Sequence, residues 1–216
     1  MNVVEKGQVG EKLPKGWKFI KLGDLCLVKG GKRLPANTDF ASKKTSFPYI
    51  RVVDFDAGTV SLNNLKYLEE ETHLKIARYV INRGDVYISI AGTIGIVGTI
   101  PDLLHGANLT ENAAKLVVKE LNVLCRDYLA RFLQSPVGQQ AIKLRTNIVG
   151  QPKLALERIA TIEIPLPPLP EQKRIVGILS DRLSTIDKAR AATEAQLQAI
   201  NALPAALLRQ AFNGEL

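Results

Sequence analysis

Residues 165–216 read PLPPLPEQKRIVGILSDRLSTIDKARAATEAQLQAINALPAALLRQAFNGEL, and this stretch decides how the chain is organised. Prolines at positions 165, 167, 168 and 170 end the unit that precedes it, because proline lacks a backbone donor and stiffens the chain. From Ile178 to Leu203 there is neither glycine nor proline, a run much longer than the usual three-turn helix. The sequence therefore predicts one long C-terminal helix of about 40 residues, roughly 60 Å from end to end.

Large apolar side chains recur along this predicted helix at positions reached by alternate steps of four and three residues: Leu179, Leu183, Ile186, Leu197, Ile200 and Leu207. This heptad spacing is typical of a coiled coil, so the helix needs a partner. Arg190 and Thr193 belong to the same series near its middle. They form a polar patch in the middle of the seam. Pro204 is expected to bend or end the main helix.

The preceding residues predict a strand-rich globular domain. Apolar residues from Trp17 onward indicate a strand followed by a short helix or second strand, and the polar stretch up to Ser46 indicates a long loop. Helical spacing begins at Leu121 and breaks at Pro136, where Ser135 can cap a second helix. Further strands are predicted at residues 47–53, 59–61, 79–81, 85–91, 94–100, 114–118 and 160–164.

The predicted fold class is α+β. A strand-rich globular domain of residues 1–168 is followed by a helical region of residues 169–216, whose long helix is expected to form a coiled coil. The chain has 216 residues, 46 % of them hydrophobic, which is enough for one full core and an appendage.

Neither a membrane span nor a metal site is expected. No apolar run approaches the roughly 20 residues of a transmembrane helix, and the first residues lack the apolar core of a signal peptide. We therefore expect a cytosolic protein. Cys26 and Cys125 have no metal-ligand spacing, and only His73 and His105 could assist them, so both cysteines are expected to be reduced structural thiols.

Positive charge is concentrated at the start of the chain. Residues 1–51 contain 11 Lys and Arg against 4 Asp and Glu, which is +7 of the formal net charge of +8. A cluster of this kind suits an anionic polymer, because neutralising phosphates releases condensed counterions. A simple gain in solubility would explain the composition equally well. The cations that stand out are in a predicted turn and the loop after it: Lys29, Lys32, Arg33, Lys43 and Lys44.

The residues give little support for catalysis. Neither histidine stands near a nucleophile motif, and Asp102, Glu111 and Lys115 imitate a metal-dependent nuclease site only loosely. The run Gly92-Thr93-Ile94-Gly95 lacks the Lys-Ser/Thr of a phosphate-binding loop, so a hairpin turn with positive φ at the glycines is the simpler interpretation. We expect no catalytic residue, no metal and no cofactor in this chain.

Several segments resemble the specificity (S) subunits of type I restriction–modification systems. Pro165-Leu166-Pro167-Pro168-Leu169-Pro170-Glu171-Gln172-Lys173-Arg174-Ile175-Val176 is similar to the start of the conserved helical region of that family, and residues 207–216 are similar to its end. Upstream, residues 13–17 and 21–24 look like the opening of a target-recognition domain. Tyr49-Ile50-Arg51, Asp54, Gly84-Asp85-Val86 and Gly92-Thr93-Ile94-Gly95 fit its internal landmarks. The resemblance covers roughly residues 13–216.

Family members usually carry two recognition domains and two helical regions, whereas this chain has one of each. It is therefore a natural half-length subunit or a fragment, and Met1 and the family-like ending at Leu216 favour an intact half. The resemblance implies a homodimer, paired as an antiparallel coiled coil, in which Leu179, Leu183, Ile186, Leu197, Ile200 and Leu207 pack against a second copy. Near the centre of such a pair, Arg190 and Thr193 would face their symmetry mates and could fix the register. A two-fold dimer predicts an interrupted palindromic target, with a few base pairs between the half-sites.

The resemblance also implies binding partners and a cellular location. The recognition domain would read the base sequence of double-stranded DNA in the major groove. The protein would act on DNA in the prokaryotic cytosol, as part of host defence. Methylation subunits would bring S-adenosylmethionine, and a nuclease or translocase subunit could join them. The expected DNA contacts are Lys29, Lys32, Arg33, Lys43, Lys44, Arg51, Thr93 and Asn108. A coiled-coil adaptor that does not bind DNA is the main alternative, and a stand-alone nuclease is a further one.

Overall fold

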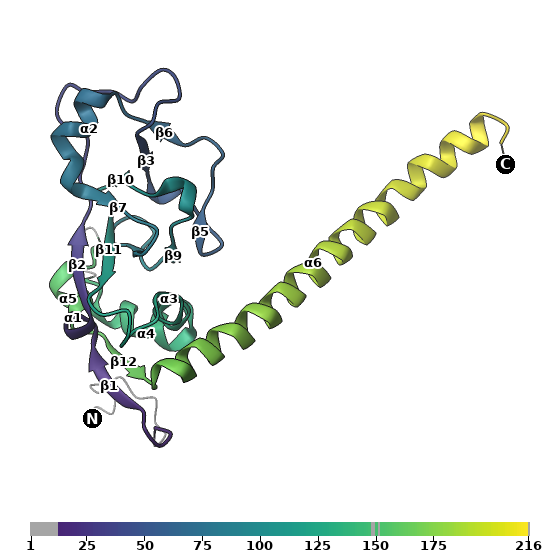
Figure 1. The fold of residues 1–216 in the computed structure, drawn as a ribbon. Helices are drawn as coiled ribbons and strands as arrows, with labels where there is room; N and C mark the ends of the chain where they lie inside the picture. Colours follow the sequence, from purple (N-terminus) through teal and green to yellow (C-terminus); the bar gives the residue numbers. More distant parts are fainter. Residues whose placement is uncertain (1–12, 148–149, 151, 216) are drawn as a thin grey trace. The chain divides into compact units, whose positions relative to one another are not determined.

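The protein is represented by a computed structural model that describes residues 13–147, 150 and 152–215 (Figure 1). The chain divides after Lys173 into two compact units. The first contains all the strands of the described residues, and the second, residues 174–216, consists of most of one long helix. An α+β chain with a strand-rich domain and a long C-terminal helix is therefore confirmed.

Two four-stranded sheets form the first unit. One has the order β2-β11-β8-β9, all antiparallel, from Cys26–Gly30, Ala113–Val118, Val86–Ser89 and Val97–Thr99. The other has the order β6-β3-β10-β7, from Lys66–Tyr67, Pro48–Ile50, Ala107–Leu109 and Val80–Ile81. Within it β3 and β10 run parallel. Two short ladders complete the unit: β1 (Lys18–Lys21) with β12 (Glu163–Leu166), and β4 (Phe55–Asp56) with β5 (Thr59–Val60).

One hydrophobic core lies where these sheets meet. Tyr87 of β8 is completely buried, its ring stacks on Phe55 with 3.8 Å between centroids, and its hydroxyl donates to Thr59 O at 2.5 Å. Burial explains why residues 86–89 do not alternate between apolar and polar, since every side chain of β8 is enclosed. Ile50, Ile81 and Leu109 from the other sheet belong to the same buried cluster.

Short helices cover the sheets. They are α1 (Leu22–Leu25), α2 (Glu70–Ile76), α3 (Arg126–Gln134), α4 (Pro136–Arg145) and α5 (Leu156–Ala160), with 3-10 turns at Val52–Asp54, Ala77–Tyr79 and Asp102–Leu104. α3 packs on β8 and β9, and α5 packs on β2. The predicted break at Pro136 is confirmed: Ser135 Oγ accepts from Gly138 N at 3.2 Å and caps α4.

Several sequence expectations differ from the structure. The predicted strand 47–53 ends at Ile50, because the carboxylate of Asp54 accepts from Arg51 N and turns the chain into a 3-10 segment. The turn expected to begin at Lys29 begins after Gly30 instead, since β2 runs through Lys29 to pair with β11. Strand β10 was not predicted. It is three residues long, and its central residue is the polar Asn108.

The long helix α6, Leu169–Phe212, has 44 residues. Its first turn belongs to the globular unit, where Gln172 is completely buried. The Gln172 side chain accepts from Cys125 N at 2.8 Å and donates to Val123 O and Pro167 O, each at 2.9 Å. This explains why the proline-rich stretch leads directly into a helix: one amide side chain satisfies three backbone groups around its start.

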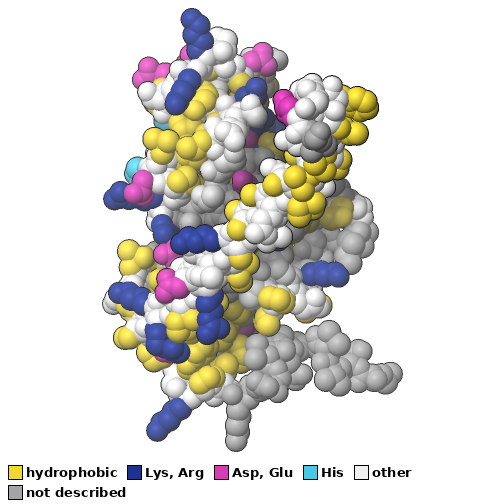
Figure 2. Space-filling view, turned by 90° about the vertical axis from the view of Figure 1, so that its right-hand side faces the viewer, with side chains coloured by type: hydrophobic (Ala, Val, Ile, Leu, Met, Phe, Trp, Pro, Cys, Tyr) yellow, Lys and Arg dark blue, Asp and Glu magenta, His cyan; other side chains and the backbone are white. Residues whose placement is uncertain are grey.

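The helix continues through Pro204, so Pro204, which was expected to bend or end it, does not end it. The missing proline donor costs the helix a backbone hydrogen bond without stopping it. The six residues of the predicted seam are between 36 % and 60 % exposed. Figure 2 shows hydrophobic side chains along this helix at its surface. No helix among the described residues is long and apolar enough to cross a membrane.

Candidate nucleic-acid interface

The chain is held tightly where it leaves β2. Gly31 N donates to Ala113 O at 2.9 Å, and Lys32 N donates to Leu109 O at 2.8 Å. The Tyr49 hydroxyl donates to Lys32 O at 2.8 Å. A Cβ atom on Gly31 would collide with the carbonyl oxygens of Leu109 and Thr110, so only glycine permits this close approach. The backbone that carries Lys32 and Arg33 is therefore fixed to β10 and β3.

Lys32 belongs to a cluster of two cations and one aromatic ring. Its Nζ lies 5.8 Å from the centroid of the Tyr79 ring, and the Arg78 guanidinium carbon lies 4.9 Å from the same centroid. Arg78 Nη2 also donates to the Tyr79 hydroxyl at 2.8 Å. The sequence did not point to Arg78 and Tyr79, because their only signal was an Arg-Tyr pair at the start of the strand predicted for residues 79–81.

Arg33 projects into solvent beside a carboxylate. Its Nε donates to Glu111 Oε1 at 2.7 Å, and its side chain is 78 % exposed. Thr110 Oγ1 donates to the other carboxylate oxygen, Oε2, at 3.0 Å. Partial burial raises the pKa of Glu111, but the hydrogen bonds from Arg33, the backbone and Thr110 outweigh it, and the net pKa is lowered. Glu111 is thus held in its charged form.

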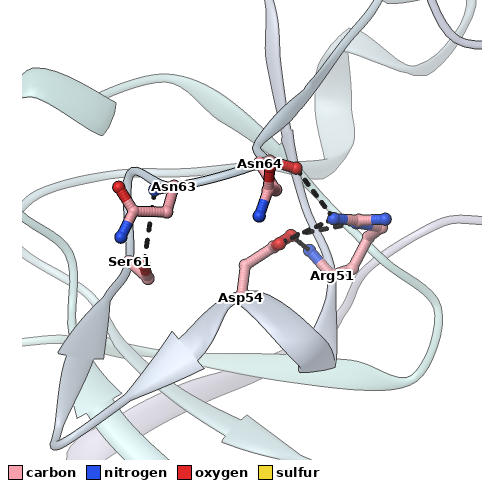
Figure 3. Close-up of polar contacts among 5 residues, drawn as sticks. All are labelled: Arg51, Asp54, Ser61, Asn63 and Asn64. Carbon is pink, nitrogen blue, oxygen red and sulfur yellow. Dashed lines mark hydrogen bonds and ion pairs between the residues drawn. The ribbon is translucent and has the colours of Figure 1, made fainter.

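Arg33 and Arg51 line one cavity of about 390 Å³, together with the exposed side chains of Val53 and Asn112. Arg51 is engaged differently from Arg33, and Figure 3 shows its partners Asp54 and Asn64. Its Nη2 donates to Asp54 Oδ1 at 2.8 Å and to Asn64 O at 3.0 Å, and its Nε donates to Asp54 Oδ2 at 3.1 Å. Asp54 is buried, so this pair ties the 3-10 turn to the segment that follows β5.

The expected loop lies between β2 and β3, and Lys43 and Lys44 are exposed on it. Three apolar loop residues hold it down, because Leu34, Phe40 and Phe47 pack on a small cluster of Tyr49, Leu68 and Ile76. Thr45 Oγ1 adds a hydrogen bond to Leu68 O at 2.6 Å. The polar residues between these three anchors are exposed or half-buried, so most of the loop surface can meet a ligand.

Thr93 and Asn108, two further expected DNA contacts, differ from each other in exposure: Thr93 is exposed in a turn and Asn108 is buried. Thr93 is exposed in a turn whose glycines, Gly92 and Gly95, have φ of 72° and 91°, as the hairpin interpretation predicted. Asn108 is completely buried. Its Oδ1 lies 2.7 Å from His73 Nδ1, and its Nδ2 donates to Ile76 O at 3.1 Å. The Asn108 amide therefore ties α2 to β10, and this position gives no support to a DNA contact.

Lys29 is exposed on β2, opposite the buried Lys115 in the β2–β11 register. Lys115 Nζ donates to Val80 O. Burial lowers the pKa of Lys115, while the charge of Asp85 opposes that effect. Among residues 13–147, 150 and 152–215, no three His, Cys, Asp or Glu side chains gather in a way that could hold a metal ion. On the face drawn in Figure 2, Lys and Arg are interspersed with other side chains rather than massed in one block.

The model of the type I restriction modification DNA specificity domain matches residues 14–200. The chain is 28 % identical over 173 residues to the EcoBI specificity subunit of Escherichia coli, covering 80 % of this chain and 36 % of that protein. It is 26 % identical over 222 residues to the putative MjaX specificity subunit of Methanocaldococcus jannaschii, covering 96 % of this chain and 48 % of the relative. The chain thus spans half or less of the length of these relatives.

Two solved structures share the fold. One is a chain from a type I R-M system whose complex assembly and conformational transition have been studied, with a TM-score of 0.72 and 24 % identity. The other is the HsdS subunit of Thermoanaerobacter tengcongensis, with a TM-score of 0.60 and 24 % identity. Each covers 96 % of this chain, and this chain covers 48 % and 47 % of them. Because the family model spans both the globular unit and most of the long helix, the chain belongs to the family of type I restriction modification DNA specificity domains.

Proposed function

We propose that this chain is the DNA-reading and spacing subunit of a type I restriction–modification complex. The observation that carries the proposal is the exposed, pre-ordered Lys32–Arg33 segment at the end of β2, in a chain of a DNA specificity family. Phosphate contacts by Lys29, Lys32, Lys43 and Lys44 would supply a salt-dependent affinity, because each contact releases counterions. Contacts to base edges would supply the sequence preference. The globular unit would lie in the major groove of one half-site.

The second part of the proposal is a homodimer through α6. Each large apolar residue of the seam is exposed, and burying a leucine or isoleucine is worth about 1.5–3 kcal/mol. In an antiparallel coiled coil, a positions of one helix pack against d positions of the other. With Leu183, Arg190 and Leu197 at a and Leu179, Ile186, Thr193 and Ile200 at d, one register satisfies the central layers.

In this register Leu183 faces Ile200 of the second copy, and Ile186 faces Leu197 of the second copy. Arg190 faces Thr193, so the two-fold axis passes between Ala191 and Ala192. Arg190 also has Asp187 three residues before it and Glu194 four residues after it, and such neighbours on a helix can balance its charge. The polar centre is then a register device rather than a defect in the seam.

The dimer would place two reading units on an interrupted palindrome, because the symmetry of the target mirrors that of the protein. The helices would set the spacing of the half-sites and offer a surface to the methylation subunits, with or without a nuclease or translocase subunit. S-adenosylmethionine would bind to the methylation subunit, and this chain would contribute recognition without catalysis. The chain would be located in the prokaryotic cytosol, bound to DNA.

Genome-wide mapping of methylated positions, in cells that carry this chain and its methylation partner, tests the function. We expect a bipartite palindromic motif that disappears when the gene for this chain is deleted. A bipartite motif without symmetry would contradict the homodimer but keep the DNA-reading role. If replacing Lys29, Lys32, Arg33, Lys43 and Lys44 with alanine left methylation unchanged, the chain would act as an adaptor instead.

Disulfide trapping tests the register. Ile186→Cys and Leu197→Cys together should cross-link two copies under mild oxidation, because the two positions face each other. Each single variant should not, since in this register its own symmetry mate lies 11 residues away along the helix, about 16 Å. Efficient cross-linking of both single variants would indicate a parallel pair. A Cys125→Ser background removes the more exposed native thiol.

A further inference from the structure

The two arginines that line the same cavity differ in which of their N–H groups are left for a ligand. Arg51 uses Nε once and Nη2 twice within the fold, which leaves only the Nη1 donors. Among the described residues, Arg33 makes one hydrogen bond, from Nε to Glu111. Its two terminal nitrogens therefore remain available, and they form the edge of the guanidinium that can donate two parallel hydrogen bonds.

The direction of this edge is fixed from both sides. The Arg33 backbone follows Lys32, whose N–H and carbonyl oxygen are both bonded to the sheet. Glu111, which holds Nε, follows Thr110, and Thr110 N donates to Ile50 O at 3.0 Å. Thr110 Oγ1 fixes the second carboxylate oxygen of Glu111. Arg33 is therefore ordered before any partner arrives, which lowers the entropy lost on binding.

The neighbouring charge also selects the kind of partner. A phosphate would approach Arg33 against the negative charge of Glu111, whereas the edge of a base carries no net charge. In the major groove, guanine presents two acceptors, O6 and N7, while adenine presents N7 beside the N6 donor. An end-on guanidinium matches guanine and leaves adenine with a donor facing a donor.

We propose that Arg33 reads a guanine of the target half-site through Nη1 and Nη2, and that Glu111 is the positioning residue that aims it. This proposal rests on the DNA-reading function proposed above. It assigns Arg51 a structural role in spite of its place in the same cavity. It also gives Glu111, an acidic residue beside a candidate DNA surface, a reason to be there.

Selection from a duplex DNA library with a randomised region tests the assignment, using the full chain together with its methylation subunit. We expect the unaltered complex to enrich a guanine at one position of each half-site. Arg33→Ala should relax that position alone, with a loss of about 10- to 100-fold for the best sequence, as expected for one bidentate base contact. Arg33→Lys should restore little, because an ammonium cannot reproduce the fork.

Glu111→Gln should weaken the preference at the same position by a smaller factor and leave the other positions unchanged. Adding Glu111→Gln to Arg33→Ala should change nothing further, since Glu111 acts through Arg33. Lys43→Ala is the matched control. It should weaken all sequences to a similar extent, as a phosphate contact does.

A uniform loss over all sequences in Arg33→Ala would overturn the proposal and make Arg33 a phosphate contact. A second relaxed position in Glu111→Gln would also overturn it, because Glu111 would then contact a base directly. In both cases the unaltered complex would still select a sequence, so the DNA-reading function would stand. If the unaltered complex enriched no sequence at all, the proposed function itself would fail.

Discussion

The backbone N–H of Cys125 donates a hydrogen bond to the side-chain oxygen of Gln172 at 2.8 Å, across 47 residues of the chain. The amide nitrogen of the same side chain reaches the carbonyl oxygens of Val123 and Pro167. Gln172 thus attaches the first turn of the long helix to the loop in front of α3. Although Gln172 is polar, its three hydrogen bonds to buried backbone groups stabilise the fold, because these groups would otherwise be left unsatisfied.

Replacing Gln172 with leucine keeps much of the volume but removes all three hydrogen bonds. Leaving these backbone groups unsatisfied should lower the free energy of unfolding by about 2–4 kcal/mol. Urea denaturation followed by circular dichroism measures the change. Gln198→Leu is the matched control, because Gln198 is exposed on the same helix and should change stability little. Equal stability of the two variants would mean that the bonds of Gln172 do not hold the helix start.

Arg51→Ala should act on stability and leave the target sequence unchanged. The variant loses the bidentate pair and leaves the buried carboxylate of Asp54 without its cation, so we expect a loss of about 1–3 kcal/mol. Thermal unfolding measures that loss, and library selection measures the target. A changed base preference at unchanged stability would show that Arg51 contacts DNA and that its role in the fold is minor.

Leu183→Asp combined with Leu197→Asp should abolish the dimer. A dimer contains four of these leucines, each worth about 2 kcal/mol when buried. Sedimentation of the variant should give a monomer with an intact globular unit, because both positions lie in the separate unit 174–216. Ala195→Asp with Gln198→Asp adds the same charge away from the seam and should leave the dimer intact. If both double variants behaved alike, the seam would not be the interface.

The Cys26 thiol should resist alkylation well above neutral pH. Burial raises the pKa of Cys26 to about 12, although the charge of Lys119 opposes this. Because the folded pKa is the higher one, the stabilising contribution of Cys26 is complete below pH 9 and is lost as the pH rises from about 9 to about 12. In a Cys125→Ser background, iodoacetamide at pH 9 should label the unfolded chain and spare the folded one. Rapid labelling of the folded chain would contradict this.

Lys43→Ala with Lys44→Ala should reduce the salt dependence of DNA binding. If both side chains contact phosphates, the slope of log affinity against log salt should become smaller by nearly 2, about 0.9 for each contact. Fluorescence anisotropy with a labelled duplex at several salt concentrations gives the slope. Lys143→Ala on α4 controls for the loss of surface charge. An unchanged slope would place the two lysines outside the interface.

The sequence correctly predicted the features that depend on interactions between residues close together in the chain. The cap at Ser135, the glycines at 92 and 95 and the long helix each depend on residues a few positions apart, and each was predicted correctly. Strand β10 depends instead on pairing with β3 and β7, far away in sequence. Nothing in the short Ala107–Leu109 segment marks it as a strand in advance.

In the candidate site, too, the sequence indicates contacts between nearby residues but not contacts between distant ones. An excess of cations near Lys29–Lys44 is visible in the composition, but the composition does not show which partner each cation contacts. Arg51 and Asp54 are three residues apart, so their pairing leaves a local trace. Arg33 and Glu111 are 78 residues apart and meet only because β2 and β10 end at the same place. Tyr79 joins Lys32 for a similar reason, and only the folded chain brings them together.

The loop between β2 and β3 is held by Leu34, Phe40 and Phe47, while the residues between them are largely exposed. Mutations at the exposed positions therefore cost the fold little, and mutations at the three anchors cost it much. A lineage that keeps the anchors can try many loop sequences without losing a working subunit. For the DNA-reading function proposed above, the sequence preference can therefore change at the exposed loop positions while the three anchors keep the fold.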